Sequence, residues 1–288
     1  MEPERVDVRP IRGNDADAVA EFLHDHLNPR GSPAAWRRLL APPWIAEPPN
    51  HGFRLVVDER IVGAYVAVYA DREIEGVTRR FCNLAAFCVL EDYRTHSFRL
   101  VRAILAQKGF DFTDFSPSGN VTALNERLGF AALDTSTRLS PNLPRLSRRG
   151  VTVSSDPGVV AGVLTGLDAL VYRDHLDAAA ARHIVVISRG EYGYLVVRKD
   201  RRKRLPLFAS PLYAGGSRDL LRAAWPQIGS HLLRRHGALA TLAEGRVLGF
   251  RPVLGIDLET PRAKMFRSTA VPAGSIDYLY SELTLLEW

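Results

Sequence analysis

Residues 81–105 read FCNLAAFCVLEDYRTHSFRLVRAIL and join an apolar segment to an amphipathic one. The first ten residues, through Leu90, are almost all apolar, which is typical of a strand buried on both faces. From Ser97 onward the apolar residues recur at the spacing of one helix face, and Lys108-Gly109 ends that pattern. The sequence therefore predicts a central strand that passes almost directly into a helix.

The residues before this stretch predict a strand, helices and a meander. Residues 5–12 alternate as a strand, and a helix capped by Asn14 or Asp15 follows. A second helical stretch around Trp36 ends at the proline-rich loop APPWIAEPP, residues 41–49. Residues 53–90 predict three antiparallel strands with turns near Asp58-Glu59 and at residues 73–76.

The residues after it continue the alternation. FDFTDFS, residues 110–116, is a short alternating strand, and GNVTALNERLGF, residues 119–130, is a helix that closes on Gly129 before another strand. The N-terminal half thus predicts the order strands, helix, strand, helix, strand. This order favours an α/β (α+β) fold with a mixed, mostly antiparallel central sheet flanked by helices.

The second half repeats this order in weaker form. SPNLPRLSRRG, residues 140–150, has the composition of a linker, so we expect domains at 1–142 and 143–288. After it come strands at 184–188, 192–197 and 205–213 and a helix at 220–235 interrupted or kinked by Pro226. Two short echoes, DHL at 25–27 and 174–176 and RLGF at 127–130 against VLGF at 247–250, indicate a degenerate tandem repeat.

Composition excludes several classes of protein. Hydrophobic residues make up 46% of the 288 and charged residues 24%, which is ordinary globular usage. We expect a cytoplasmic protein, because neither a signal peptide nor eighteen consecutive apolar residues occur. Cys82 and Cys88 lie six strand residues apart, roughly 20 Å, and should be free thiols. His24 and His26 have no partners that would complete a metal site, so no metal is expected.

Positive charge gathers in the C-terminal half. Residues 146–288 carry a net charge of +7 and residues 1–145 a net charge of −1. The run RKDRRKR, Arg198 to Arg204, lies between two predicted strands and is interpreted first as a solvated hairpin tip. The alternative is a patch for an acidic partner such as a nucleotide phosphate or a polyanion. Nucleic acid is disfavoured, because no aromatic stacking pattern accompanies the run.

The stretch from Cys82 to Phe130 resembles the GNAT (GCN5-related N-acetyltransferase) superfamily, with a degenerate GNAT-like repeat implied for the second half. In that family the central strand ends in a loop, Arg/Gln-x-x-Gly-x-Gly/Ala, which opens a helix and binds the diphosphate of coenzyme A. Here Arg94 matches the first position, whereas Ser97 and Arg99 replace the glycines. Unpaired N–H groups at a helix start bind phosphate readily. The resemblance implies contacts to acetyl-CoA from these residues: Phe87, Cys88, Val89, Arg94, Thr95, His96, Ser97, Phe98 and Arg99.

A second resemblance concerns the family's closing helix, Asn-x-x-Ala-x-x-Leu-Tyr-x-Lys-x-Gly-Phe. Gly129 and Phe130 match its end, and Asn125 falls on the tyrosine that in many relatives protonates the departing thiolate. An amide does not titrate, so Asn125 is expected to hydrogen-bond the sulfur. The central strand carries Asn83 and Leu84 in place of a catalytic glutamate. The candidate general bases are Asp114, Glu91 and His51.

The resemblance implies an acyl-CoA-dependent N-acyltransferase that acts on a small amine or amino sugar, with no metal and with dimerisation left open. The loop 41–49, with Trp36 and Trp44, is a candidate wall of the acceptor pocket, although Trp36 also fits a core position. Two alternatives remain at this stage: a non-catalytic protein that binds acyl-CoA, and acyl transfer from an aminoacyl-tRNA.

Overall fold

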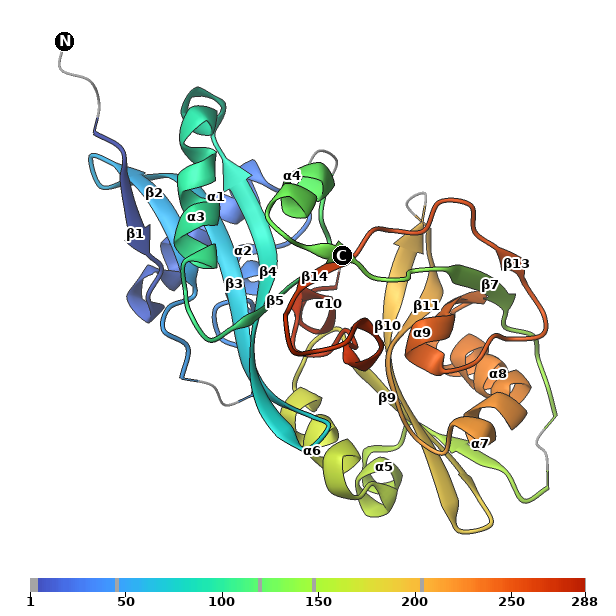
Figure 1. Cartoon of the computed structure of the whole chain (residues 1–288). Helices are drawn as coiled ribbons and strands as arrows, with labels where there is room; N and C mark the ends of the chain where they lie inside the picture. The colour runs from blue at the N-terminus through green and yellow to red at the C-terminus, as the bar shows by residue number, and fades with distance from the viewer. Residues whose placement is uncertain (1–4, 45–46, 119–120, 147–148, 203–204, 288) are drawn as a thin grey trace.

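The computed structural model describes residues 5–44, 47–118, 121–146, 149–202 and 205–287. Two seven-stranded sheets stand side by side, each with helices on both faces (Figure 1). The mixed, mostly antiparallel α/β architecture predicted from the sequence is confirmed. Within the described part of the chain, no helix is both long and apolar enough to cross a bilayer.

The first sheet is built mainly from the N-terminal half. Neighbouring strands are antiparallel except for β4 and β5, which are parallel. In spatial order its strands are β1 (Asp7–Pro10), β2 (Gly52–Val57), β3 (Arg60–Ile74), β4 (Val77–Val89), β5 (Asp111–Asp114), β14 (Met265–Arg267) and β6 (Ala131–Ala132).

The second sheet repeats this arrangement position by position. Its one parallel pair, β11 and β12, occupies the place of β4 and β5. In the same spatial order its strands are β8 (Thr152–Ser154), β9 (Arg182–Ser188), β10 (Glu191–Arg202), β11 (Leu205–Gly216), β12 (Ala240–Glu244), β7 (Thr137–Pro141) and β13 (Ile256–Asp257). The second sheet thus has the topology of the first, and the tandem repeat of two units stays a prediction.

The two sheets exchange one strand each. β7 follows the N-terminal unit in sequence but lies between β12 and β13, and β14 crosses back to lie between β5 and β6. Strands on either side of the predicted boundary at 142/143 are therefore shared between the sheets. The division into 1–142 and 143–288 stays a prediction about domains, and neither range contains a whole sheet.

Helices cover both faces of each sheet in matching places. Residues of α1 and α2 pack on alternate side chains of β3 (Ala64, Val66, Val68), and α3 packs on the opposite face. In the second sheet α5 and α6 take the place of α1 and α2, and α7 and α8 that of α3. The helices are α1 (Ala16–His26), α2 (Pro33–Arg37), α3 (Ser97–Leu105), α4 (Val121–Arg127), α5 (Pro157–Val163), α6 (Gly166–His175), α7 (Arg218–Ala223), α8 (Trp225–His236), α9 (Gly245–Leu248) and α10 (Glu282–Leu285), with short 3-10 turns η1 (Gly13–Asp15), η2 (Glu91–His96) and η3 (Ala273–Ser275).

Several local predictions are confirmed. Asp58 and Glu59 both adopt positive φ in the tight β2–β3 turn, as a two-residue hairpin requires. Pro226 lies in the first turn of α8 and separates it from α7. The RLGF and VLGF echoes fall at equivalent places, because Gly129 follows α4 and Gly249 follows α9, both with positive φ. Cys82 and Cys88 are free thiols.

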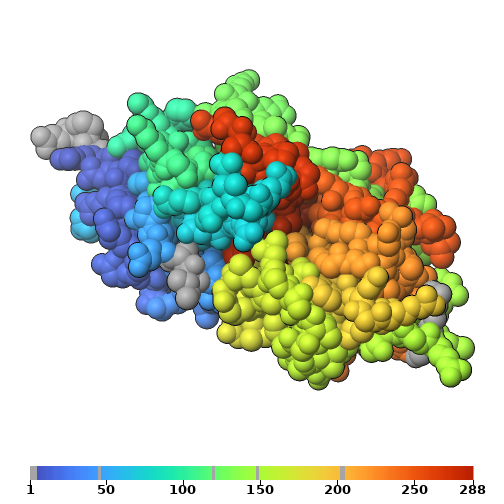
Figure 2. Space-filling model, turned by 60° about the horizontal axis from the view of Figure 1, so that its bottom comes forward, coloured from blue at the N-terminus to red at the C-terminus, as the bar shows by residue number. Residues whose placement is uncertain are grey.

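One hydrophobic core joins the two halves. It combines the α1–α2 face of the first sheet with the α5–α6 face of the second and with the end of the chain. Trp44 donates its indole N–H to the Tyr69 carbonyl, and its ring contacts His175 at a tilt and Tyr280 edge to face, both from the other half. Residues near the end of the chain, red in Figure 2, lie between the blue and the yellow-orange halves. The halves therefore form one packed body.

Candidate active site

A cavity of about 630 Å³ opens where β4 and β5 diverge, and both halves line it. The two strands are hydrogen-bonded only from Phe81 to Asn83 on β4, after which β5 turns away. Leu84 to Phe87 then form the cavity wall with no strand on that side. Volume and shape suit a small-molecule ligand.

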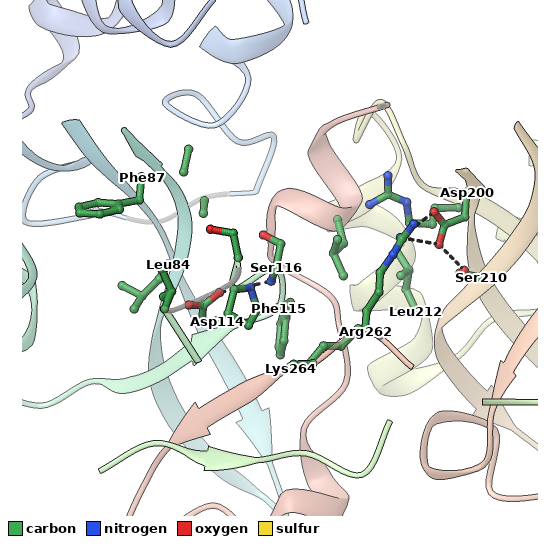
Figure 3. Close-up of a pocket in the computed structure, with 18 of the residues that line it drawn as sticks. Leu84, Phe87, Asp114, Phe115, Ser116, Asp200, Ser210, Leu212, Arg262 and Lys264 are labelled. Atoms are coloured by element: carbon green, nitrogen blue, oxygen red, sulfur yellow. Dashed lines mark hydrogen bonds and ion pairs between the residues drawn. The ribbon is translucent and has the colours of Figure 1, made fainter. Parts of the chain in front are cut away.

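Figure 3 shows how the two walls face each other. Leu84, Phe87, Asp114 and Ser116 lie on one side, and Asp200, Ser210 and Arg262 lie on the other. Trp36 lines the cavity and is also almost fully buried. It is therefore both a core residue and part of the cavity wall. No residue of the described part of the 41–49 loop lines this cavity.

Asp114 is the buried carboxyl group of the N-terminal wall. It is the last residue of β5 and is only 4% exposed. Asn125 of α4 donates its amide N–H to Asp114 Oδ2 at 2.8 Å, and the Ser116 backbone N–H donates to Oδ1 at 3.3 Å. Burial raises the pKa of Asp114 to about 7, against the opposing effect of the Asn125 hydrogen bond. The carboxyl group is thus placed to exchange a proton near neutral pH.

A second buried carboxylate stands behind Asp114. Glu282 of α10 accepts hydrogen bonds from Ser116 Oγ at 2.7 Å and from the Asn83 amide. Burial raises its pKa. The sequence analysis missed Glu282, although an acid inside the apolar segment YLYSELTLL was a usable signal, because a buried carboxylate needs partners.

The other predicted bases lie elsewhere. Glu91 is on the surface at the start of η2, with its side chain 83% exposed and paired to Arg94 at 3.4 Å. His51 is half-buried beside the 41–49 loop, where burial lowers its pKa, and it does not line the cavity. The structure thus brings together Asp114 and Asn125, two of the three residues predicted to be catalytic, and sets Glu91 apart.

The predicted coenzyme residues divide into four groups. Phe87 lines the cavity, while Cys88 and Val89 pack partly into the two cores on either side of the sheet. Phe98 is half-exposed in an open groove between α3 and the end of α4. The rest lie on η2 or at the start of α3, on the surface or half-buried: Arg94, Thr95, His96, Ser97 and Arg99.

The start of α3 differs from the expected phosphate cradle. η2 runs into α3 without a break, and the Ser97 N–H donates to the Arg94 carbonyl. The helical run begins at Glu91 and Asp92, whose acidic side chains repel a diphosphate. Arg99 donates to the Val6 carbonyl at 2.7 Å. Binding of the diphosphate by residues 94–99 stays a prediction. The Ser97 N–H is not available as a donor for it, because it already donates to the Arg94 carbonyl.

Arginines gather in the nearby open groove. Arg102 of α3, Arg127 of α4 and Arg267 of β14 line it together with Phe98. Arg267 lies over the Phe112 ring of β5 and beside Gly129. Guanidinium groups bind phosphate oxygens strongly. This groove is therefore a candidate for phosphate binding by side chains in place of backbone N–H groups.

The equivalent place in the second unit is partly filled. Asp168 of α6 lies against the end of β11 at Gly215 and accepts hydrogen bonds from Tyr213 (2.7 Å) and Tyr192 (3.0 Å). Farther along β11, the Tyr278 N–H occupies the Leu212 carbonyl, and the Tyr278 hydroxyl donates to Glu244 at the end of β12. Ser210, Pro211 and Leu212 nevertheless line the far side of the same cavity.

The position of Asp168 predicts that Gly215 cannot be replaced by a larger residue without loss of stability. A Cβ added at Gly215 would lie 1.9 Å from Asp168 Oδ1, so Gly215→Ala should lower the free energy of unfolding by about 1 to 3 kcal/mol. Urea unfolding measures the loss. Gly245→Ala is the control, because nothing lies within 4 Å of its added Cβ. Equal stability of both variants would show that Asp168 does not pack against this end of β11.

The described residues contain no group of three or more His, Cys, Asp or Glu that could hold a metal ion.

Neither a protein-family model nor a curated protein matches the sequence. Solved structures do match. A probable N-acyltransferase from Enterococcus faecalis has a TM-score of 0.59 at 13% identity, over 91% of this chain and 72% of its own. This chain has the GNAT fold. A GCN5-related N-acetyltransferase from Kribbella flavida has a TM-score of 0.59 at 15% identity, over 94% of this chain and 72% of its own.

Another GNAT-fold match is a glucosamine N-acetyltransferase region of a fungal multi-domain β-N-acetylglucosaminidase, with a TM-score of 0.59 at 12% identity. The match covers 92% of this chain and 38% of that chain. At these identities the likeness shows a shared GNAT fold, and the chemistry has to be argued from the site.

Proposed function

We propose that this chain is an acyl-CoA-dependent N-acyltransferase for a small amine. Its N-terminal unit binds the acyl donor, and its C-terminal unit completes the acceptor pocket. The observation that carries the proposal is the open β4–β5 divergence, with a cavity along Leu84–Phe87 and the titratable Asp114 in its wall. The matches to a probable N-acyltransferase and to a glucosamine N-acetyltransferase region support acyl transfer, and an amino sugar among the acceptors.

The unpaired β4 edge suits the pantetheine arm of coenzyme A. Backbone groups at a free strand edge bind an extended chain of amides as an added strand would be bound. β5 pairs with β4 only as far as Asn83, so the next residues of β4 are free on this side. The diphosphate end would meet the groove formed by Arg102, Arg127 and Arg267. The residues present thus fit acyl-CoA, with phosphate recognition by arginine side chains.

The reaction needs a neutral amine held against the thioester carbonyl. As the nitrogen attacks, the N–C bond forms, the C–S bond breaks, and Asp114 accepts the proton that the amine loses. The departing thiolate regains a proton from Asp114, directly or through water, while Asn125 holds the Asp114 carboxyl group in place by its hydrogen bond. Orientation in the cavity supplies the larger part of the acceleration, and the base adds about 10²- to 10⁴-fold.

One set of measurements tests the proposal. Calorimetry with acetyl-CoA should show binding, and thiol release should appear with at least one member of a panel of amino sugars, amino acids and polyamines. Binding without release on any amine would replace the proposal with a non-catalytic acyl-CoA-binding protein. Absence of binding, with tRNA retained at moderate salt, would favour aminoacyl-tRNA as the donor.

The dependence of the rate on pH is a separate prediction. Asp114 must be ionised to accept a proton, so kcat should rise with pH and level off above about 7. In Asp114→Asn this inflection should disappear. Glu21→Gln, which removes an exposed carboxylate on α1, should keep it. Persistence of the inflection in Asp114→Asn would assign the base to another group.

A further inference from the structure

The C-terminal wall of the cavity carries more positive than negative charge. Its cationic side chains are Arg198, Arg201, Arg262 and Lys264, and its anionic side chains are Asp200 and Glu244. The opposite wall contributes Asp114, which is neutral below about pH 7. An uncharged amine leaves two positive charges of the cavity unbalanced below about pH 7, and one when Asp114 is ionised.

Arg198 is the unusual member of this wall. The sequence analysis interpreted it as part of a solvated hairpin tip, and this is wrong for Arg198, which is 3% exposed. On β10 the side chains alternate, so Arg198 and Asp200 point inward while Lys199 and Arg201 are exposed. Burial lowers the pKa of Arg198 without removing its charge.

The partners of Arg198 are weak. Its guanidinium donates to two backbone carbonyls, those of Leu286 at 3.3 Å and Lys199 at 3.5 Å. No carboxylate lies within ion-pair distance of it in the described structure. The carboxylates that act on Arg198 from farther away, Asp200 and Glu282 foremost, lie beyond ion-pair distance, so an oxyanion from a ligand would compensate this buried charge more closely.

The nearby acids are already engaged. Asp200 accepts two contacts from Arg262, at 2.9 and 3.2 Å, and one from Ser210 at 2.8 Å. Glu282 is bonded to Asn83 and Ser116, and Glu287 to Arg182. In the same wall Glu244 is paired with Lys264. Within the described structure, the two positive charges of this wall that no ion pair engages are therefore those of Arg198, which is buried, and Arg201, which is exposed.

We infer that the acceptor amine carries an oxyanion, a carboxylate or a phosphate, which Arg198 binds in the wall opposite Asp114. That the bound molecule is the acceptor of the acyl group rests on the proposed function. The anion-binding site itself does not depend on catalysis. The amine then points toward the β4–β5 divergence, and the oxyanion toward β10. The C-terminal unit thus selects the substrate.

The test uses paired amines that differ in one anionic group. Glucosamine 6-phosphate is compared with glucosamine, and alanine with alaninamide, by kcat/KM for thiol release from acetyl-CoA. In the wild type the anionic member of one pair should be preferred about 10- to 100-fold, as expected for a charge-assisted hydrogen bond. The pair that shows the preference identifies phosphate or carboxylate.

Two variants and a control assign the preference to this wall. Arg198→Gln should reduce it to near unity. Arg262→Gln, at a more exposed position, frees Asp200 to neutralise Arg198 and should also reduce it, even if Arg198→Gln does not fold. Arg234→Gln, an exposed arginine on α8, removes the same charge elsewhere and should keep it. Lack of preference in both pairs, or its persistence in Arg262→Gln, would overturn the inference.

Failure of the proposed function gives a different pattern. If no amine releases thiol, calorimetry with inorganic phosphate and with acetate still tests the anion site. Binding by the wild type that weakens about tenfold or more in Arg262→Gln would support the site without the activity. No binding of either anion would overturn it.

Discussion

Asp114→Asn should lower kcat by about 10²- to 10⁴-fold while making the protein more stable above pH 7. The loss of rate follows because the amide cannot accept the proton from the amine. Asn is nearly isosteric and can still accept the hydrogen bond from Asn125, so the cavity keeps its shape. Few substitutions are expected to lower activity and raise stability together, and the combination distinguishes a catalytic carboxyl from a structural one.

The gain in stability follows from the raised pKa. Below about pH 4 Asp114 is protonated in both the folded and the unfolded state, so it does not lower the free energy of unfolding. Between the ordinary aspartate pKa of 3.8 and about pH 7 the unfolded state ionises and the folded state does not, so the penalty on folding grows and is complete above pH 7. At about 1.4 kcal/mol per pH unit, less one weakened hydrogen bond, we expect a gain of about 1 to 3 kcal/mol at pH 8.

Urea unfolding of both proteins at pH 8 and pH 4 measures this difference. The variant should be more stable at pH 8, and the difference should shrink toward zero or reverse at pH 4. A variant that is inactive and less stable at pH 8 would mean that Asp114 is a structural carboxylate satisfied by Asn125 and Ser116.

Residues 1–142 produced as a separate fragment should fail to fold. The fragment lacks β14, so β5 loses its second neighbour and β6 loses its only one. It also exposes the α1–α2 core that packs on the C-terminal half, including Trp36 and Trp44. The measurement is near-ultraviolet circular dichroism with size-exclusion chromatography, where the fragment should show no fixed tertiary signal.

The control is production of residues 1–142 together with residues 143–288. The two fragments should recover a soluble complex, because each supplies the strand that the other sheet lacks. A fragment 1–142 that unfolds cooperatively on its own would contradict the role given to the exchanged strands.

Local structure could be predicted from the sequence because its signals are local. The helix at α3 and the turn at Asp58-Glu59 follow from apolar spacing and hairpin rules. The exchange of β7 and β14 could not be predicted, since MFR at 265–267 has no periodicity and pairs with residues about 150 positions away. Such pairing depends on the assembled core, which short segments do not encode.

The candidate site, too, could be predicted only in part from the sequence. Asp114 and Asn125 were predicted separately, and the fold brings them to 2.8 Å. Arg198 was assigned to a solvated run because its neighbours are basic, although the strand alternation that buries it was present in VVRKDRR. The ion pair between Glu244 and Lys264 could not be predicted from the sequence. The two residues are brought together only because the chain returns from the end of β12 to the start of β14.

Backbone hydrogen exchange with and without acetyl-CoA tests the central claim most directly. The account predicts slower exchange in the β4 segment 84–89 on addition of the coenzyme, with the β11 segment 213–216 unchanged because Asp168 already packs against it. Protection confined to 213–216, or no protection in either strand at saturating acetyl-CoA, would contradict it.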